Sequence, residues 1–294
     1  MRPINKQLLF VFLCSYCFIL KAQIPEDEKN ALLSLFTTTK GTHWNVPWNL
    51  SEPVDYWYGV KIRDNHVVSI ELGRNNLSGC LPKEISALEK LEVLNLSLNN
   101  LSGNFPKEIL SLRELKEISL EMNNFKNQIP AEFGSLQNLE ILSLYNNAFI
   151  GPIPESLGTI KSLKVINLSG NYLEGTIPLS FEGLSNLEVL GLFGNKLSGV
   201  IALNFNKLPN LYELTLAYNK FNGPVPNGLE GLGDLKYLQL QGNNFNSFEG
   251  LRNLNRALLI TLNTDSIGFQ KGAELLEVEL VPVVNSKTQL LKLE

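Results

Sequence analysis

Residues 139–162, LEILSLYNNAFIGPIPESLGTIKS, decide the fold of this chain, because the same frame recurs before and after them without a slip. The ninth position of this stretch is an asparagine, and an asparagine recurs at a spacing of 24 residues on both sides of it. The series is Asn75, Asn99, Asn123, Asn147, Asn171, Asn195, Asn219 and Asn243. Repeats of this length are typical of solenoids, in which each unit stacks only on its neighbours. The sequence therefore predicts eight stacked units.

The eight units, numbered 1 to 8, fill residues 67–258 and share one pattern of apolar and turn-forming residues. Apolar residues hold positions 1, 4, 6 and 11, glycine usually holds position 13, and proline usually holds position 16. Positions 4 and 6 point to one face of a short strand, and positions 3, 5 and 7 point to the other face. Because one unit cannot bury its apolar side alone, we predict a shared core and a parallel sheet. Glycine and proline disfavour a long helix on the return side.

The repeated asparagine at position 9 is predicted to be structural. It falls where each strand turns away from the sheet, and its side chain carries both a donor and an acceptor for backbone groups that lack a strand partner. The eight asparagines share the period of the core and not that of any site. We therefore expect a ladder of buried asparagines along the stack, and not a set of ligand contacts.

The frame LxxLxxLxLxxNxLxGxIP resembles the plant-type leucine-rich-repeat family, closely over residues 67–248. Residues 23–66 resemble the amino-terminal cap of that family, in the segment ALLSLF, around Trp48 and in the motif WYGV from Trp57. The resemblance implies an α/β fold: a right-handed solenoid with a concave parallel sheet, a short 3-10 or irregular convex side, and terminal caps. It implies binding of proteins, peptides or carbohydrates, and neither catalysis nor a cofactor.

Two departures from the plant pattern favour a bacterial, Bacteroidetes-like, exported relative. The family's cap normally carries a cysteine pair, which this cap lacks, and the ending Lys-Ala-Gln of the amino-terminal segment resembles exported proteins of that type. Residues 1–22 are interpreted as a signal peptide, with basic Arg2 and Lys6 before an apolar run and a small residue at Ala22. A retained anchor is the alternative. We expect a secreted or cell-surface protein without a membrane span in the mature chain.

The two ends of the solenoid need caps, because an open end would expose core. The aromatic residues of the first cap, Trp44, Trp48, Trp57 and Tyr58, are expected to be cap core. Residues 259–294 are interpreted as a carboxy-terminal cap or tail, in which Leu259 and Leu262 begin a degenerate ninth strand and a further strand lies within residues 274–284.

The chain shows no residue pattern that predicts chemistry. His43 and His66 are its only histidines, and no metal-binding or phosphate-binding motif is present. Four glutamates on the predicted sheet are interpreted as a solvated face: Glu71, Glu117, Glu121 and Glu213. Cys80, the one cysteine beyond the signal, is either a spectator or an intermolecular cross-link. We therefore predict no catalytic, cofactor or metal site, and the net charge of −4 does not favour nucleic acid.

Exposed aromatic residues in the later units predict a binding patch. Aromatic side chains bury a large area at low entropic cost, and a folded surface has no need of many on one sheet face. The candidate residues, with two lysines on the rim, are Tyr145, Tyr172, Phe193, Lys196, Tyr218, Lys220 and Tyr237. The alternative is that these rings pack on each other or on loops.

The most favoured function is a non-catalytic binding module that recognises a protein or peptide, or else a glycan, through the concave face. Two other functions stay open. One is a structural or adhesive spacer of a surface assembly, and the other is an inhibitor of a secreted hydrolase, which is what some plant-type relatives are.

Overall fold

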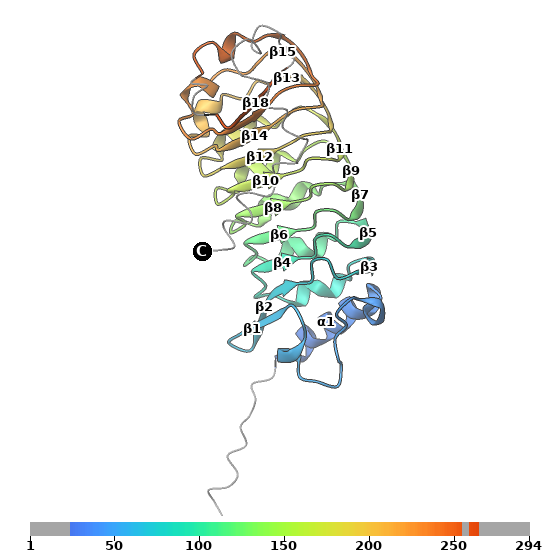
Figure 1. Cartoon of the computed structure of the whole chain (residues 1–294). Coiled ribbons are helices and arrows are strands. Elements are labelled where there is room, and N and C mark those ends of the chain that lie inside the picture. Colours follow the sequence, from blue (N-terminus) through green and yellow to red (C-terminus); the bar gives the residue numbers. More distant parts are fainter. Residues whose placement is uncertain (1–23, 255–258, 265–294) are drawn as a thin grey trace, which may run out of the picture.

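The computed structural model describes residues 24–254 and 259–264. The interpreted signal peptide (residues 1–22), the last four residues of unit 8 and the strand expected within residues 274–284 lie outside the described residues. The described chain is an elongated stack in which the amino-terminal cap lies at one end and the last repeats at the other (Figure 1).

A ten-stranded sheet runs along one side of the stack (Figure 1). It starts with an antiparallel pair, β1 (Val60–Arg63) and β2 (His66–Glu71), and all later pairs are parallel. The later strands are β4 (Val93–Asn95), β6 (Glu117–Ser119), β8 (Ile141–Ser143), β10 (Val165–Asn167), β12 (Val189–Gly191), β14 (Glu213–Thr215), β16 (Tyr237–Gln239) and β18 (Thr261–Asn263). Partners in register are 24 residues apart, as in Leu142 opposite Ile166. The predicted parallel sheet and the predicted ninth repeat strand are therefore both present.

A second parallel sheet, called here the lateral sheet, was not predicted from the sequence. Its strands cover positions 10–14 of the units, directly after the repeated asparagine. They are β3 (Ser78–Gly79), β5 (Asn100–Asn104), β7 (Asn124–Gln128), β9 (Ala148–Gly151), β11 (Tyr172–Gly175), β13 (Lys196–Val200), β15 (Lys220–Pro224) and β17 (Asn244–Ser247). Backbone pairing holds this sheet together, so its side-chain pattern is weak.

Short 3-10 helices form the return side, as the glycine and proline positions predict. Proline is the residue before five of them, as Pro154 is before η6. Its fixed φ suits a helix start, where no backbone donor is lost. The helices are η3 (Lys83–Ala87), η4 (Lys107–Ser111), η5 (Ala131–Ser135), η6 (Glu155–Thr159), η7 (Leu179–Gly183), η8 (Phe205–Lys207), η9 (Leu229–Gly231) and η10 (Glu249–Leu251).

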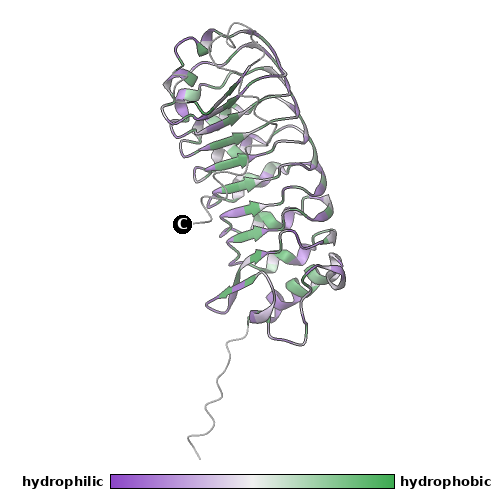
Figure 2. Ribbon diagram, viewed as in Figure 1, coloured by the Kyte–Doolittle hydropathy of each residue, from purple (hydrophilic) through white to green (hydrophobic). Residues whose placement is uncertain are grey.

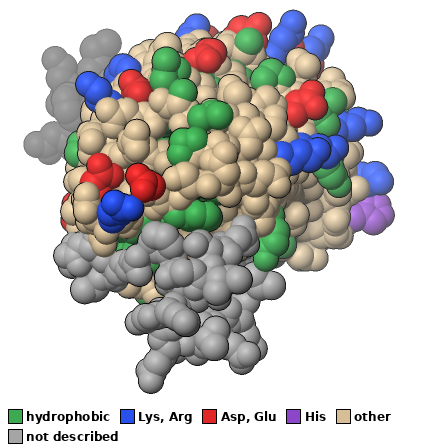
Figure 3. Space-filling view, turned by 90° about the horizontal axis from the view of Figure 1, so that it is seen from above, with side chains coloured by type: hydrophobic (Ala, Val, Ile, Leu, Met, Phe, Trp, Pro, Cys, Tyr) green, Lys and Arg blue, Asp and Glu red, His purple; other side chains and the backbone are tan. Residues whose placement is uncertain are grey.

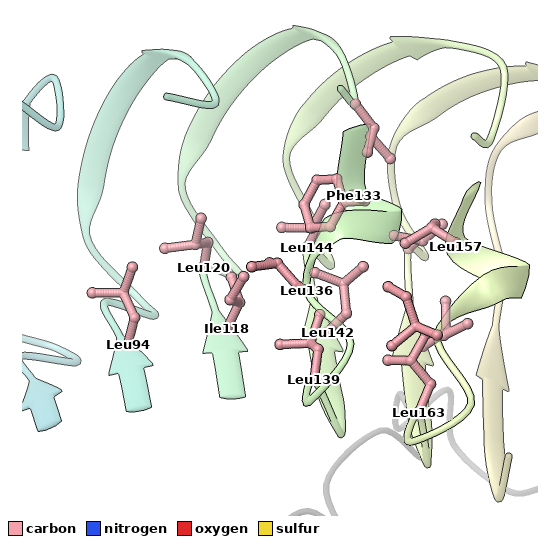
Figure 4. Close-up of a cluster of buried hydrophobic side chains, with 14 of the residues drawn as sticks. Leu94, Ile118, Leu120, Phe133, Leu136, Leu139, Leu142, Leu144, Leu157 and Leu163 are labelled. Atoms are coloured by element: carbon pink, nitrogen blue, oxygen red, sulfur yellow. The ribbon is translucent and has the colours of Figure 1, made fainter. Parts of the chain in front are cut away.

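One continuous core fills the space between the sheets and the return side (Figure 4). In unit 4 the apolar positions 1, 4, 6 and 11 are Leu139, Leu142, Leu144 and Phe149, and all four are fully buried. Each such side chain stabilises the fold by about 2 kcal/mol through the apolar area that it removes from water. The strands of the ten-stranded sheet are correspondingly hydrophobic in Figure 2.

The asparagine at position 9 ties consecutive units together. Asn171 donates from Nδ2 to the carbonyls of Leu144 and Leu168, each at 3.0 Å, and its Oδ1 accepts the backbone N–H of Phe149 at 3.0 Å. Similar bonds join the asparagines at 99, 123, 147, 195, 219 and 243 to neighbouring units. These side chains therefore satisfy backbone groups that no strand partner reaches.

The amino-terminal cap packs helix α1 (Glu26–Thr38) and the short helices η1 (Gly41–His43) and η2 (Val54–Tyr56) against unit 1. The Glu28 carboxylate is buried and accepts the backbone N–H of Val67 at 2.8 Å, which ties α1 to β2. The cap also completes the first rung of the ladder, because the backbone N–H of Val46 donates to Asn75 Oδ1 at 2.7 Å.

Three tryptophans form the core of this cap. Trp48 lies between Trp44 and Trp57, with ring centroids 4.9 and 4.8 Å away. All three are buried, as expected. The same expectation for Tyr58 was wrong, since its side chain is 49% exposed. Tyr58 follows Trp57 directly, and the backbone carbonyl of Tyr58, not its ring, is tied into the cap by Trp48 Nε1 at 2.8 Å.

Candidate binding face

The concave face is defined here as the face of the ten-stranded sheet that is turned away from the core. Positions 3, 5 and 7 of each unit point to it, and position 8 borders it. Four of the candidate residues lie on this face: Tyr145, Phe193, Tyr218 and Tyr237. Tyr218 is 48% exposed, and the other three are half-buried.

The concave rings contact one another in part. Phe193 and Tyr218 meet edge to face with centroids 5.2 Å apart, and Tyr237 meets Tyr212 in the same way at 5.4 Å. The alternative that the rings pack together therefore holds for these pairs. Edge-to-face packing holds each ring in one orientation while the outer face of Tyr218 stays open to a partner.

Of the other three candidates, Tyr172 was assigned to the aromatic patch and Lys196 and Lys220 to its rim, but all three lie outside the concave face. Tyr172, Lys196 and Lys220 are the first residues of β11, β13 and β15, so they belong to the lateral sheet. Lys196 Nζ lies 5.1 Å from the centroid of the Tyr172 ring. Both lysines line a shallow hollow of about 480 Å³ on that sheet. The predicted patch is therefore two surfaces, because the turn after position 9 starts a new sheet.

Position 8 adopts the left-handed conformation in all eight units. Four units have Arg74, Leu98, Met122 and Asn146 there, with φ between 52° and 58°. Three others have glycine, for which this conformation is free of strain. Unit 7 has Tyr218, with φ of 55°. The left-handed conformation is therefore a property of the repeat, and Tyr218 is the one aromatic residue that adopts it at this position.

A glycine in the next unit makes room for the Tyr218 ring. A Cβ atom added at Gly242 would lie 2.6 Å from the ring of Tyr218. Gly170 accommodates Tyr145 less tightly, since a Cβ there would lie 3.5 Å from that ring. Gly242, unlike Gly170, therefore sets the position of its neighbouring ring.

Unpartnered polar atoms gather on the concave face of units 5–8, and sequence reasoning missed them. Four buried side-chain atoms have no hydrogen-bond partner within the described residues: Asn167 Nδ2, Glu213 Oε1, Thr215 Oγ1 and Gln241 Oε1. Buried polar atoms are normally hydrogen-bonded, so a cluster of exceptions calls for an explanation. These four atoms are buried by residues of the adjacent strands, which are 24 residues away in the sequence. The pattern within one unit therefore does not show their burial.

Glu213 contradicts the expectation of a solvated row of glutamates. Its side chain is 3% exposed, and burial raises its pKa to about 7. Glu117 holds the same position in unit 3 and is half-buried, and Ser119 donates to its carboxylate at 2.7 Å. Glu71 is likewise paired, with Lys61 at 2.8 Å.

Metal-binding groups, the free cysteine and the length of the helices bear on other kinds of function. Among residues 24–254 and 259–264, no group of three or more His, Cys, Asp or Glu side chains is placed to hold a metal ion. Cys80 is exposed. No helix within those same ranges has the length and apolarity needed to cross a membrane. Seen from the end that carries the last repeats, charges of both signs are interspersed with hydrophobic groups (Figure 3).

The comparisons with known proteins agree with this architecture. The family described as leucine-rich repeat matches residues 137–197, and a second model of that description matches residues 90–112. The structure of PEPR1-AtPEP1 is 33% identical with a TM-score of 0.68, and the match covers 78% of this chain and 34% of that one. The ectodomain of the Arabidopsis thaliana receptor kinase GASSHO1/SCHENGEN3 is 27% identical with a TM-score of 0.66, covering 78% and 32%.

A bacterial protein is also similar. A leucine-rich-repeat protein of Leptospira interrogans is 37% identical with a TM-score of 0.52, and the match covers 63% of this chain and 46% of that one. The chain spans about a third of the length of the two structures named above. The repeats, the two sheets and these likenesses together show that the chain has an open leucine-rich-repeat solenoid fold, similar to that of plant receptor ectodomains.

Proposed function

We propose that the protein is a non-catalytic binding module that recognises a protein or peptide through the concave face of units 4–8. The observation that carries this proposal is the placement of aromatic rings and unpartnered polar atoms on the same half of one face. Rings provide contact area, and unpaired donors and acceptors provide directional bonds to a partner. A spacer has no use for either.

The similar structures support a peptide or protein partner. GASSHO1/SCHENGEN3 was solved in complex with CASPARIAN STRIP INTEGRITY FACTOR 2, and PEPR1 was solved with AtPEP1. An extended chain that crosses the concave face would supply backbone donors and acceptors to Asn167, Thr215 and Gln241. A glycan remains the second ligand class, because sugar hydroxyls also pair with such groups and stack on rings.

We also infer that the protein is exported and that its source is bacterial. The basic and apolar residues 1–22, the cap without cysteines and the likeness to the Leptospira protein support this inference. Mass spectrometry of the protein purified from its source tests it. A mature chain that starts at residue 23 is expected, and an intact residue 1 would contradict it.

The experiment that tests the binding function starts from residues 23–294. A random peptide library and a glycan array are screened in parallel, and hits are measured by titration calorimetry. Saturable binding of a peptide is the expected result. Saturable binding of glycans alone would move the proposal to the second ligand class, and no ligand of either class would favour the spacer. Loss of activity of a co-incubated secreted hydrolase would favour the inhibitor.

A further inference from the structure

We propose that Glu213 selects a basic side chain, lysine or arginine, in the peptide that binds to the concave face. This inference rests on the proposed function and names the chemistry of its partner. It assigns Glu213 a role in specificity that no repeat consensus requires, since only one of the other seven units has a glutamate at position 3, Glu117.

The Glu213 carboxylate is buried away from water, and no group among the described residues replaces the lost hydrogen bonds to Oε1. It stands on β14 between Val189 of β12 and Tyr237 of β16, which are its partners in register. Within the described residues it forms no hydrogen bond and no ion pair, and Oε1 is buried without a partner. An ionised carboxylate in this state is unstable until a cation or a donor reaches it. Because it has no bond to break, it is free to turn toward a ligand.

Glu117 shows what a structural glutamate at this position looks like. In unit 3 the serine two residues later, Ser119, donates to Glu117 at 2.7 Å. In unit 7 the hydroxyl two residues later belongs to Thr215, and this hydroxyl has no partner either. The glutamate and the hydroxyl are therefore hydrogen-bonded to each other in unit 3 but not in unit 7.

The charge of this half of the concave face favours a cation. At positions 3, 5, 7 and 8 of units 5–8, Glu213 is the one charged residue, and none is lysine or arginine. Lys196 and Lys220 lie on the lateral sheet and not on this face. A basic side chain from the ligand is then the group that neutralises Glu213 at the lowest cost.

Aromatic rings beside Glu213 suit the same ligand. Tyr237 is its neighbour on β16, and Tyr212 packs edge to face on Tyr237. Tyr212 also lines a hollow of about 260 Å³ at the start of these strands, together with Glu188, Asn210, Asp234 and Lys236. This hollow has two carboxylates and one ammonium group, so its net charge is negative. Ring faces attract lysine and arginine, so the rings and the carboxylate act in the same direction.

Binding of a basic peptide is expected to depend on pH. The ionised form of Glu213 is the form that attracts a cation, and its pKa is raised to about 7. Affinity should therefore rise between pH 6 and pH 8 and level off above. Tyr212 and Tyr237 lie beside it, and burial raises the pKa of the Tyr212 phenol further above its usual value. Glu188, Asp234 and Lys236 are the other ionisable groups nearby, in the adjoining hollow.

The test uses residues 23–294 and a positional-scanning library of nonapeptides. At each position the library carries arginine, lysine, or the uncharged isosteres citrulline and norleucine. Affinities are measured for the wild-type protein, for Glu213→Gln and for the matched control Glu117→Gln. Wild type should prefer arginine or lysine at one position by about tenfold over the isostere. Glu213→Gln should lose this preference and its pH dependence while still binding the isostere peptide, and Glu117→Gln should keep both.

Two results would overturn the inference without touching the proposed function. One is peptide binding by wild type with no basic preference at any position. The other is a basic preference that survives in Glu213→Gln, which would place the recognising group elsewhere. Absence of binding by any peptide would instead contradict the proposed function, and this inference with it. Thermal unfolding of each variant confirms that a loss of binding does not come from a loss of fold.

Discussion

The first and second halves of the concave face share one scaffold but treat their polar side chains differently. In units 1–3 the polar groups pair within the protein, as Ser69 with Glu71 and Ser119 with Glu117 do. In units 5–8, four buried polar atoms stay without a hydrogen-bond partner among the described residues, beside exposed or half-buried rings, although Ser169 Oγ accepts the backbone N–H of Phe193.

Under the proposed function, the repeat consensus and the ligand use different positions. The core positions and the asparagine are the same along the whole stack, so they carry stability. Positions 3, 5, 7 and 8 vary, and in the second half they leave polar atoms unsatisfied, which lowers stability and which the proposed partner would compensate.

The largest effect on stability is expected at the asparagine ladder, and it should be equal in the two halves. Asn123→Ala and Asn195→Ala each leave buried backbone groups without a partner. We expect each to lower the free energy of unfolding by about 3 kcal/mol. Urea unfolding followed by circular dichroism measures this. Costs that differ by more than a factor of two between the halves would show that the scaffold is not uniform.

Removing the Glu213 charge is expected to stabilise the protein at high pH. Because the folded-state pKa is raised above its usual value, the folded state binds the extra proton, so wild-type stability falls as pH rises from about 4.5 to about 7 and is flat above. The free energy of unfolding of Glu213→Gln should therefore be about 2 kcal/mol higher than that of wild type at pH 8. At pH 4 the two should differ little.

Glu117→Gln is the matched control for that measurement. Its carboxylate already accepts a bond from Ser119, so the substitution weakens a bond and brings no gain. We expect a loss of about 0.5 kcal/mol at pH 8. Equal responses of Glu213 and Glu117 in chemical unfolding would contradict the contrast between the two halves.

Replacing a residue at position 8 in units 1–3 by glycine is expected to leave the stability of the protein unchanged or to raise it slightly. Met122 has φ of 55°, a conformation that costs a non-glycine residue about 1 kcal/mol. Its side chain is 40% exposed, so little packing is lost. Met122→Gly should change the free energy of unfolding by about 0.5 kcal/mol or less, in either direction, since glycine also loses more entropy on folding. A large loss, read from thermal unfolding, would mean that Met122 packs against a partner group.

The smallest effect belongs to the surface ion pair in the middle of the stack. Lys164 Nζ lies 2.6 Å from the Glu140 carboxylate, and both side chains are about two-fifths exposed. Solvent-exposed pairs contribute about 0.5 kcal/mol or less. Lys164→Ala should therefore leave the urea midpoint nearly unchanged, and a shift comparable to that of Asn195→Ala would overturn this ranking.

The sequence predicted the ten-stranded sheet and the core because burial at positions 4 and 6 repeats in every unit. It did not predict the lateral sheet, because positions such as Tyr172, Lys196 and Lys220 show no alternation and are held by backbone pairing. Those three residues were consequently placed on the wrong surface. The concave rings were found because aromatic residues are conspicuous in a repeat.

Glu213 was misjudged for a different reason. Its burial depends on Val189 and Tyr237, which are 24 residues away on either side, whereas Glu117 at the same position stays half-exposed and paired. A single unit of sequence does not distinguish the two glutamates. Comparing each position-3 residue with its neighbours in the adjacent units gives the signal that was missed.

The central claim is that the second half of the concave face binds the partner, and one pair of variants tests it most directly. Titration calorimetry with the best peptide from the screen compares Tyr145→Ala/Phe193→Ala/Tyr218→Ala with Arg74→Ala/Leu98→Ala/Met122→Ala, which changes the first half. We expect the first triple variant to weaken binding about 100-fold and the second to leave it within about twofold of wild type, since a few aromatic residues carry most binding energy. Equal loss in both, or retained binding in a folded first variant, would contradict the claim.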